Sequence, residues 1–209
     1  MQKILNLLAR HRMLSGIGLL ALCGAILLIC ILVFSPAEPQ PRGTNSTGIT
    51  ARIAYWRTYT DPTGGFTLSY PAIMATSTRS ASQEDGSSYR GTALSLSGPT
   101  QEPGTPLTDG ISIFMRVQPL QSTLEAFAEQ EAESVFASPE GIAGTLQPIT
   151  HNGVEGYTFS AHAVVPFTNL ILPLTDTQVL VISYTTPDPT AQGFSELADT
   201  ILASLHIPR

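Results

Sequence analysis

The feature that most constrains this chain is an uncharged apolar stretch from Met13 to Phe34, MLSGIGLLALCGAILLICILVF. As a helix rising about 1.5 Å per residue, a stretch of this length spans the roughly 30 Å hydrocarbon layer of a bilayer. An acidic, proline-rich segment follows it, and the basic residues that precede it are Lys3, Arg10 and Arg12. The positive-inside rule therefore predicts a single-pass protein of the cell membrane, with residues 1–12 in the cytoplasm and the remainder outside.

Three alternatives to a retained, monomeric anchor start from the same segment. A cleavable signal peptide would use Ser35 and Ala37 as its small residues, but its apolar region usually runs about 7–15 residues. A lipoprotein signal needs a small residue before the cysteine, whereas leucine and isoleucine precede Cys23 and Cys30. A helix-pairing face would use small residues, which are common in membrane helices: Gly18, Ala21 and Ala25. We favour the retained, monomeric anchor.

The rest of the chain reads as a linker and one domain. Residues 35–50, SPAEPQPRGTNSTGIT, are rich in Pro, Gly, Ser and Thr and lack apolar periodicity, which indicates a flexible spacer. Asn45 begins a glycosylation pattern, Asn-Ser-Thr, that we attribute to chance. Residues 51–209 are long enough for one well-cored domain outside the cytoplasm. Both cysteines lie in the apolar segment, so the fold of this domain depends on its core and not on disulfides.

The charge balance excludes some classes of partner. From Met13 onward, seven basic and sixteen acidic residues give a formal charge of −9. A nucleic-acid surface needs clustered Lys and Arg to displace counterions, so we expect no nucleic-acid partner. The same acidity argues against docking on anionic lipid.

Alternation of apolar and polar residues predicts a domain made mainly of strands. The predicted strands lie near 55–60, 66–70, 90–97, 110–117, 145–150, 154–164, 167–172 and 178–185. The polar segments between them, 75–89 and 98–108, are predicted to be loops. The stretch 59–72, YTDPTGGFTLSYPA, is predicted to be a hairpin: Asp61 to Gly65 turn, Phe66, Leu68 and Tyr70 face the core, and Pro71 ends the strand.

Two helical patterns complete the domain. Residues 123–137 carry an apolar stripe, and Ser122 with Glu125 has the spacing of a capping box. The second helix is predicted to begin at Asp188-Pro189 and to run toward Leu205. Because Val179 to Ile182 is apolar on both faces, the sheet is expected to be covered on both sides. These elements predict an α+β fold, an antiparallel sheet sandwiched between helices.

Motifs that would mark catalysis or cofactor binding are not found. The sequence contains no nucleophile elbow, no phosphate-binding glycine loop and no standard metal-ligand spacing among its histidines, so we predict no enzyme activity, metal site or cofactor. Its helical glutamates fit a solvent-exposed face. A hydrolase with dispersed carboxylates is a less favoured alternative, and its candidates would be Asp61, Asp109, Glu155 and Asp176.

Several short motifs resemble those of the PsbP-like family. They are Tyr59-Thr60-Asp61, Gly65 to Pro71, Leu124 to Phe127, the segment Asn152 to Phe159, and the closing Ile201 to Leu205. The resemblance covers roughly residues 56–207 and implies an antiparallel sheet between helices. Members of this family commonly have a tryptophan shortly after the Tyr-Pro, where this chain has Ile73 and Met74.

A family fold does not by itself assign a function. We expect a non-catalytic domain that binds another envelope protein or assists a complex. The alternative is a domain that binds a small ligand or a cell-wall glycan, because aromatic faces suit sugars and apolar ligands. The candidate surface for either role is formed by Trp56, Tyr59 and Tyr70.

Overall fold

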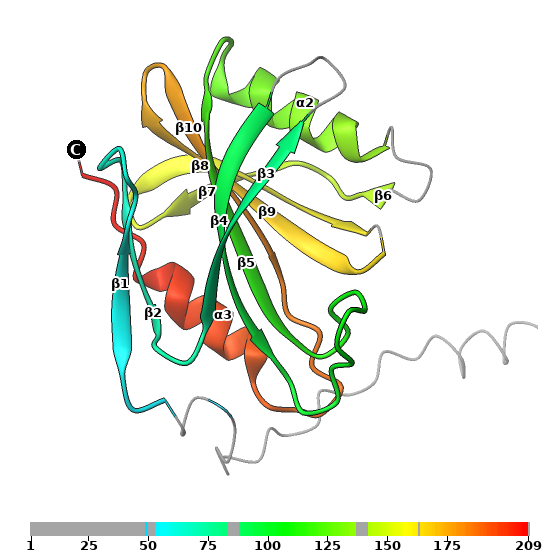
Figure 1. The fold of residues 1–209 in the computed structure, drawn as a ribbon. Coiled ribbons are helices and arrows are strands. Elements are labelled where there is room, and N and C mark those ends of the chain that lie inside the picture. The colour runs from blue at the N-terminus through cyan, green and yellow to red at the C-terminus, as the bar shows by residue number, and fades with distance from the viewer. Residues whose placement is uncertain (1–48, 50–52, 83–87, 137–141, 163, 209) are drawn as a thin grey trace, which may run out of the picture. The chain divides into compact units, whose positions relative to one another are not determined.

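The alternating sequence pattern produces a large antiparallel sheet, seen in the computed structural model of the chain (Figure 1). The structure describes residues 49, 53–82, 88–136, 142–162 and 164–208. These residues fall within one compact unit, Ser46–Arg209. The predicted anchor at 13–34 and nearly all of the linker lie outside the described residues. Among the residues described, no helix is long and apolar enough to cross a bilayer.

The main sheet has eight strands, and a separate two-stranded hairpin precedes it. The hairpin strands are β1 (Trp56–Thr60) and β2 (Thr67–Pro71). The strand order in the sheet is β3-β4-β5-β10-β9-β8-β6, with β7 also paired to β8. The sheet strands are β3 (Ala75–Ser82), β4 (Ser88–Ser97), β5 (Gly110–Pro119), β6 (Ile142–Ala143), β7 (Gln147–His151), β8 (Val154–His162), β9 (Pro166–Thr175) and β10 (Gln178–Thr185). The helices are α2 (Leu124–Phe136) and α3 (Phe194–Ala203).

One face of the sheet is covered by α3 and by the β1–β2 hairpin (Figure 1). Alternate residues of each strand point to this face, and the apolar stripe of α3 packs on them. The resulting core contains large, fully buried side chains such as Phe66, Ile113, Ile182 and Phe194. We call this side the α3 face.

The opposite side, which we call the α2 face, has a smaller core. Here Ala128 and Ala132 of α2 pack against Phe159, Ile171 and their neighbours on β8, β9 and β10. Strand β10 therefore contributes to both sides, with Leu180 and Ile182 on the α3 face and its other buried residues on the α2 face. The α+β class, the antiparallel sheet and its two-sided covering are as the sequence predicts.

The opening hairpin is also as predicted. Its turn is closed by bonds from Asp61 N–H to Phe66 O (3.0 Å) and from Gly64 N–H to Asp61 O (2.8 Å). Gly64 has φ 76°, which only glycine adopts freely. Phe66, Leu68 and Tyr70 are buried, and Pro71 is the last residue of β2.

Three local predictions were wrong. Residues 75–89 include the edge strand β3 and the start of β4, because pairing with β4 stabilises a strand whose described side chains are small and exposed. The predicted capping box is not formed: α2 is capped by Thr123, whose hydroxyl accepts the Ala126 N–H at 3.2 Å. Helix α3 begins at Phe194, because a turn containing Ala191 and Gly193, both with positive φ, intervenes after Asp188.

Asp188 nevertheless acts at the start of α3. Its carboxylate accepts the N–H groups of Gln192 and Gly193 at 2.7 Å, and that of Phe194 at 3.2 Å. Such bonds satisfy amides that have no partner within the helix. Asp188 therefore bonds to the amides at the start of the helix, but the N-cap is Gly193, five positions after the predicted cap.

Candidate functional site

The three aromatic residues proposed from sequence do not share one face of the hairpin. Tyr70 is buried in the core of the α3 face. Tyr59 packs on Phe66, with ring centroids 5.7 Å apart, and its hydroxyl lies 3.1 Å from the Thr92 hydroxyl. Trp56 is 41% exposed and pairs with Pro71, so its side chain lies on the opposite face of the hairpin from Tyr59. Ligand binding by the three together stays a prediction.

Two of the candidate carboxylates have structural partners. Asp61 accepts the N–H of Thr63 at 3.0 Å and also its hydroxyl, within the β1–β2 turn. Asp109 is fully buried and accepts both the amide (2.8 Å) and the hydroxyl (2.7 Å) of Thr100. The hydroxyl of Thr190 donates to it at 3.3 Å. Through these hydrogen bonds, Asp109 joins the β4–β5 loop to the segment that precedes α3.

The environment of Asp109 stabilises its charged form. Burial raises the pKa of this carboxyl, but the hydrogen bonds from Thr100 and Thr190 lower it, and the net pKa lies below the usual value. The remaining candidates, Glu155 and Asp176, are exposed, and Asp176 lies in the β9–β10 turn. The structure therefore does not bring the four candidate carboxylates together.

The histidines likewise form no cluster in the described part of the chain. The ring Nε2 of His151 lies 2.9 Å from the carbonyl of Leu202, at the end of α3. His162 and His206 are exposed, and the backbone of His206 pairs with Thr67. Among the residues that the structure describes, no group of three or more His, Cys, Asp or Glu could hold a metal ion.

A groove of about 630 Å³ lies on the α2 face, between the first turn of α2 and the β7–β8 hairpin. The hairpin forms because Asn152 (φ 49°) and Gly153 (φ 79°) take the positive φ angles that a two-residue turn requires. The groove is lined by Thr123, Leu124, Glu125, Pro148, Ile149, Thr150, Glu155, Gly156 and Tyr157. Its volume is in the range of pockets that hold a small molecule or a short peptide segment.

The strand beside this groove has an unpaired edge. In the described part of the chain, β7 pairs with β8 alone. Pro148 lies in this strand, and proline is tolerated on edge strands because it has no N–H to contribute to the ladder. Because Pro148 pairs with Tyr157 and Thr150 pairs with Glu155, these four side chains lie on the groove side of the hairpin. An extended segment laid along β7 would place alternate side chains over the groove.

The groove is acidic. Glu125 and Glu155 are both exposed and contribute from opposite walls, whereas none of the described residues that line the groove is basic. Leu124 and the ring of Tyr157 are partly buried and provide apolar surface. The arrangement suits a basic, extended ligand better than an anionic one. Among the described residues that line it, no nucleophile is paired with a base.

Sequence reasoning missed this site. The sequence pattern predicted Glu125 to lie in a capping box on a solvent-exposed helix and gave Glu155 as one of four dispersed carboxylates, and no local pattern connects the two residues. The one available signal was the Asn152-Gly153 pair, which predicts a tight hairpin with exposed strands.

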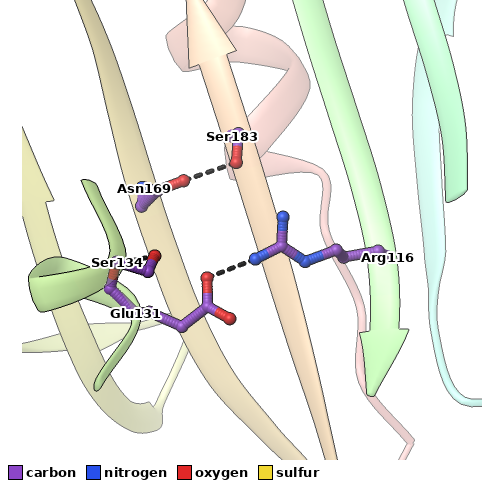
Figure 2. A network of polar contacts seen from close by, with 5 residues as sticks. All are labelled: Arg116, Glu131, Ser134, Asn169 and Ser183. Atoms are coloured by element: carbon purple, nitrogen blue, oxygen red, sulfur yellow. Dashed lines mark hydrogen bonds and ion pairs between the residues drawn. The ribbon is translucent and has the colours of Figure 1, made fainter. Parts of the chain in front are cut away.

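A polar network lies next to the core of the α2 face (Figure 2). Arg116 of β5 forms an ion pair with Glu131 of α2, and their side chains are 11% and 13% exposed. Close by, the hydroxyl of Ser183 donates to the side-chain oxygen of Asn169, a buried residue. Figure 2 shows Arg116 and Glu131 extending toward each other between the strand and the helix. The Arg116–Glu131 pair joins β5 to α2, which forms one wall of the groove.

A smaller cavity of about 340 Å³ lies on the other side of the β7–β8 turn, against the C-terminal segment. Its polar lining is largely engaged: Asn152 donates to the carbonyls of Ala203 (3.1 Å) and Leu205 (2.8 Å), and His151 contacts Leu202. These bonds satisfy carbonyl groups at the end of α3. We therefore take the groove on the α2 face as the candidate functional site.

Comparisons with known proteins show similarity in fold at low sequence identity. No family model and no curated protein matches this chain. The cyanobacterial PsbP (CyanoP) from Synechocystis sp. PCC 6803 is similar at 12% identity and a TM-score of 0.45, covering 75% of this chain and 94% of that chain. LpqN of Mycobacterium tuberculosis, involved in cell envelope biogenesis, is similar at 10% identity and a TM-score of 0.43, covering 80% and 100%.

Proposed function

We propose that this protein is a single-pass membrane protein whose domain lies outside the cytoplasm and binds another envelope protein without catalysis. The observation that carries the proposal is the groove of about 630 Å³ beside the unpaired edge of β7. Unpaired strand edges bind extended peptides through main-chain hydrogen bonds, and neighbouring pockets select the side chains.

The charge of the groove specifies the partner segment. With Glu125 and Glu155 on its walls, the groove binds an extended segment that carries Lys or Arg at alternate positions. Leu124 and Tyr157 accommodate an apolar residue between them. Two glutamates on the exposed surface of α2, Glu129 and Glu133, do not line the groove and provide a matched control.

The proposal is tested by affinity purification of the full-length chain from crosslinked membranes of its source cell. The chain with E125K and E155K is compared with the chain carrying E129K and E133K, which has the same net charge. A specific partner is expected with the native chain and with the control, and its recovery is expected to fall at least about tenfold with the groove variant. Equal recovery from both variants would exclude the groove. Absence of any specific partner, together with substrate turnover by the purified protein, would contradict a binding function.

The topology has its own test. A cysteine introduced at Ser46, in the linker, is expected to react with a membrane-impermeant maleimide in intact cells, because the linker is proposed to lie outside. The native cysteines, Cys23 and Cys30, lie in the proposed anchor and serve as the unlabelled background. Labelling only after lysis would place the domain in the cytoplasm and contradict the proposal.

A small ligand or cell-wall glycan is the second candidate for the bound molecule. The cavity beside His151 and Leu205 favours it, since about 340 Å³ accommodates a small ligand. Thermal-shift screening against glycan fragments would support this candidate if a stabilising fragment lost its effect in a His206→Trp variant, which places a larger side chain at an exposed lining position. Stabilisation that persists in that variant would place the ligand elsewhere.

A further inference from the structure

Three large side chains that do not line the groove are exposed to solvent, and two of them are aromatic. Tyr55 is 78% exposed, Trp56 41% and Ile73 55%. The backbone brings them together at one end of the β1–β2 hairpin: Trp56 pairs with Pro71, and Ala72 N–H donates to Tyr55 O at 2.9 Å. We call Tyr55, Trp56 and Ile73 the hairpin end. Large exposed apolar side chains gathered at one place indicate an interaction surface.

We propose that the hairpin end rests on the lipid bilayer in which the chain is anchored. This inference rests on the anchor that is part of the proposed function. Tryptophan and tyrosine are enriched where proteins meet the membrane–water interface, because an apolar ring and a polar N–H or O–H match the two sides of that interface. Ile73 adds an aliphatic group that favours the acyl region.

The position of the hairpin end in the chain supports this occupant. Residues 35–48 separate the apolar segment from Ile49, whose N–H donates to Gln192 O at 2.7 Å and whose side chain, like that of Ile53, packs on the core of the α3 face. A chain of 14 residues with the random-coil behaviour of a linker spans roughly 20 Å. The first exposed aromatic residues of the domain are therefore held close to the bilayer, at an effective concentration at which even weak surface contacts form.

The distribution of charge supports the same occupant. Residues 53–82 contain three charged residues, Arg57, Arg79 and Asp61, and Asp61 is buried. From residue 83 onward the sequence has fourteen acidic and three basic residues. The overall acidity that argues against anionic lipid thus belongs to the rest of the domain, although the exposed Arg57 points to the opposite face of β1 from Trp56. An anionic leaflet repels this end less than it repels the remainder.

The chain provides its own probe, because Trp56 is its single tryptophan. The full-length protein is reconstituted into vesicles of phosphatidylcholine and phosphatidylglycerol, with and without brominated acyl chains. Flotation and resistance to carbonate extraction report the anchor, and quenching of tryptophan fluorescence by bromine reports contact of Trp56 with lipid. We expect a chain that floats and loses most of its tryptophan fluorescence to the brominated lipid.

A matched control moves the tryptophan to the opposite side of the domain. Val164, 64% exposed, lies in the β8–β9 turn, which Figure 1 shows across the sheet from β1. The W56F/V164W variant is expected to float and to show little quenching. A second variant, Y55S/I73S, keeps Trp56 and is expected to lose a large part of the quenching. All four positions are exposed, so these variants are expected to fold.

The outcomes separate this inference from the proposed function. A chain that does not float overturns the anchor, and with it the docking that depends on the anchor. A chain that floats without quenching of Trp56, or with equal quenching at positions 56 and 164, overturns the docking alone. If Trp56 is protected from solvent in source-cell membranes but not in lipid vesicles, a protein partner covers the hairpin end. That result would also overturn docking on lipid.

Discussion

The two faces of the sheet differ in how they are covered. The α3 face is a broad apolar core in which α3 and the hairpin close over β4, β5, β9 and β10. The α2 face has a smaller core, an ion pair between Arg116 and Glu131, and the acidic groove beside β7. The first face provides most of the buried apolar surface, and therefore most of the stability. The second has polar groups and the edge of β7, which pairs only with β8 in the described part of the chain and which we propose to bind a partner.

The difference suggests why one domain can be both stable and adaptable. A large core fixes the strands from one side, so the other side tolerates a partly polar layer and a hollow. The groove therefore has a rigid floor formed by β7 and β8, while one wall depends on the weaker attachment of α2.

The largest expected effect comes from a matched pair of isoleucines. Ile182 and Ile171 are both fully buried, in neighbouring strands, but lie on the α3 face and the α2 face respectively. Ile182→Ala is expected to lower the free energy of unfolding by about 4–5 kcal/mol, and Ile171→Ala by about 2–3 kcal/mol, because the smaller core relaxes more easily around a cavity. Urea unfolding of the domain measures both. Equal losses, or a larger loss at Ile171, would contradict the comparison.

The second largest expected effect on the free energy of unfolding comes from the ion pair between Arg116 and Glu131. Arg116→Met is expected to cost about 2–3 kcal/mol, because the Glu131 carboxylate then stays mostly buried without its ion-pair partner. The double variant R116M/E131L is expected to recover to within about 1 kcal/mol of the native chain, since apolar side chains replace both charges. Unfolding of the single and double variants in urea measures the coupling. If the double variant loses as much as the single variant, the ion pair is not what holds α2.

The smallest effect is a shift in acid stability. The pKa of Asp109 is lower folded than unfolded, so its charged form stabilises the fold above the unfolded pKa of about 3.9. This contribution is lost as the pH falls through the lowered pKa. Thr100→Val removes a hydroxyl donor and raises that pKa, and the acid-unfolding midpoint is expected to move to higher pH. Thr105→Val, in the same loop but bonded to the Glu102 carbonyl, is expected to leave the midpoint unchanged.

The larger features of the fold were predictable from local pattern. Both helices, the antiparallel strands and the opening hairpin are encoded by periodicity and turn residues that lie close together in sequence. Strand β3 was not predictable in this way, because Ser77 and Thr78 are exposed and no apolar alternation marks the strand. Its order comes from pairing with β4, a tertiary effect that a local window does not contain.

The candidate site was less predictable than the fold. The groove joins the first turn of α2 with a hairpin more than twenty residues later, and the ion pair that holds its wall joins Arg116 to Glu131. Such pairs depend on strand order, which periodicity does not specify. The aromatic residues proposed from the sequence do not share one face, because side chains alternate along β1 and those of Trp56 and Tyr59 point to opposite sides.

The most direct test of the central claim compares the two edges of the sheet. A photocrosslinking amino acid is placed at Thr150 of β7, beside the groove, or at Thr78 of β3, which is also exposed and lies on the opposite edge. In membranes of the source cell, full-length protein with the probe at position 150 is expected to give a specific adduct with an envelope protein, joined through a basic segment. The probe at position 78 is expected to give none. Adducts of equal yield at both edges, or at position 78 alone, would contradict the assignment of the groove as the binding site.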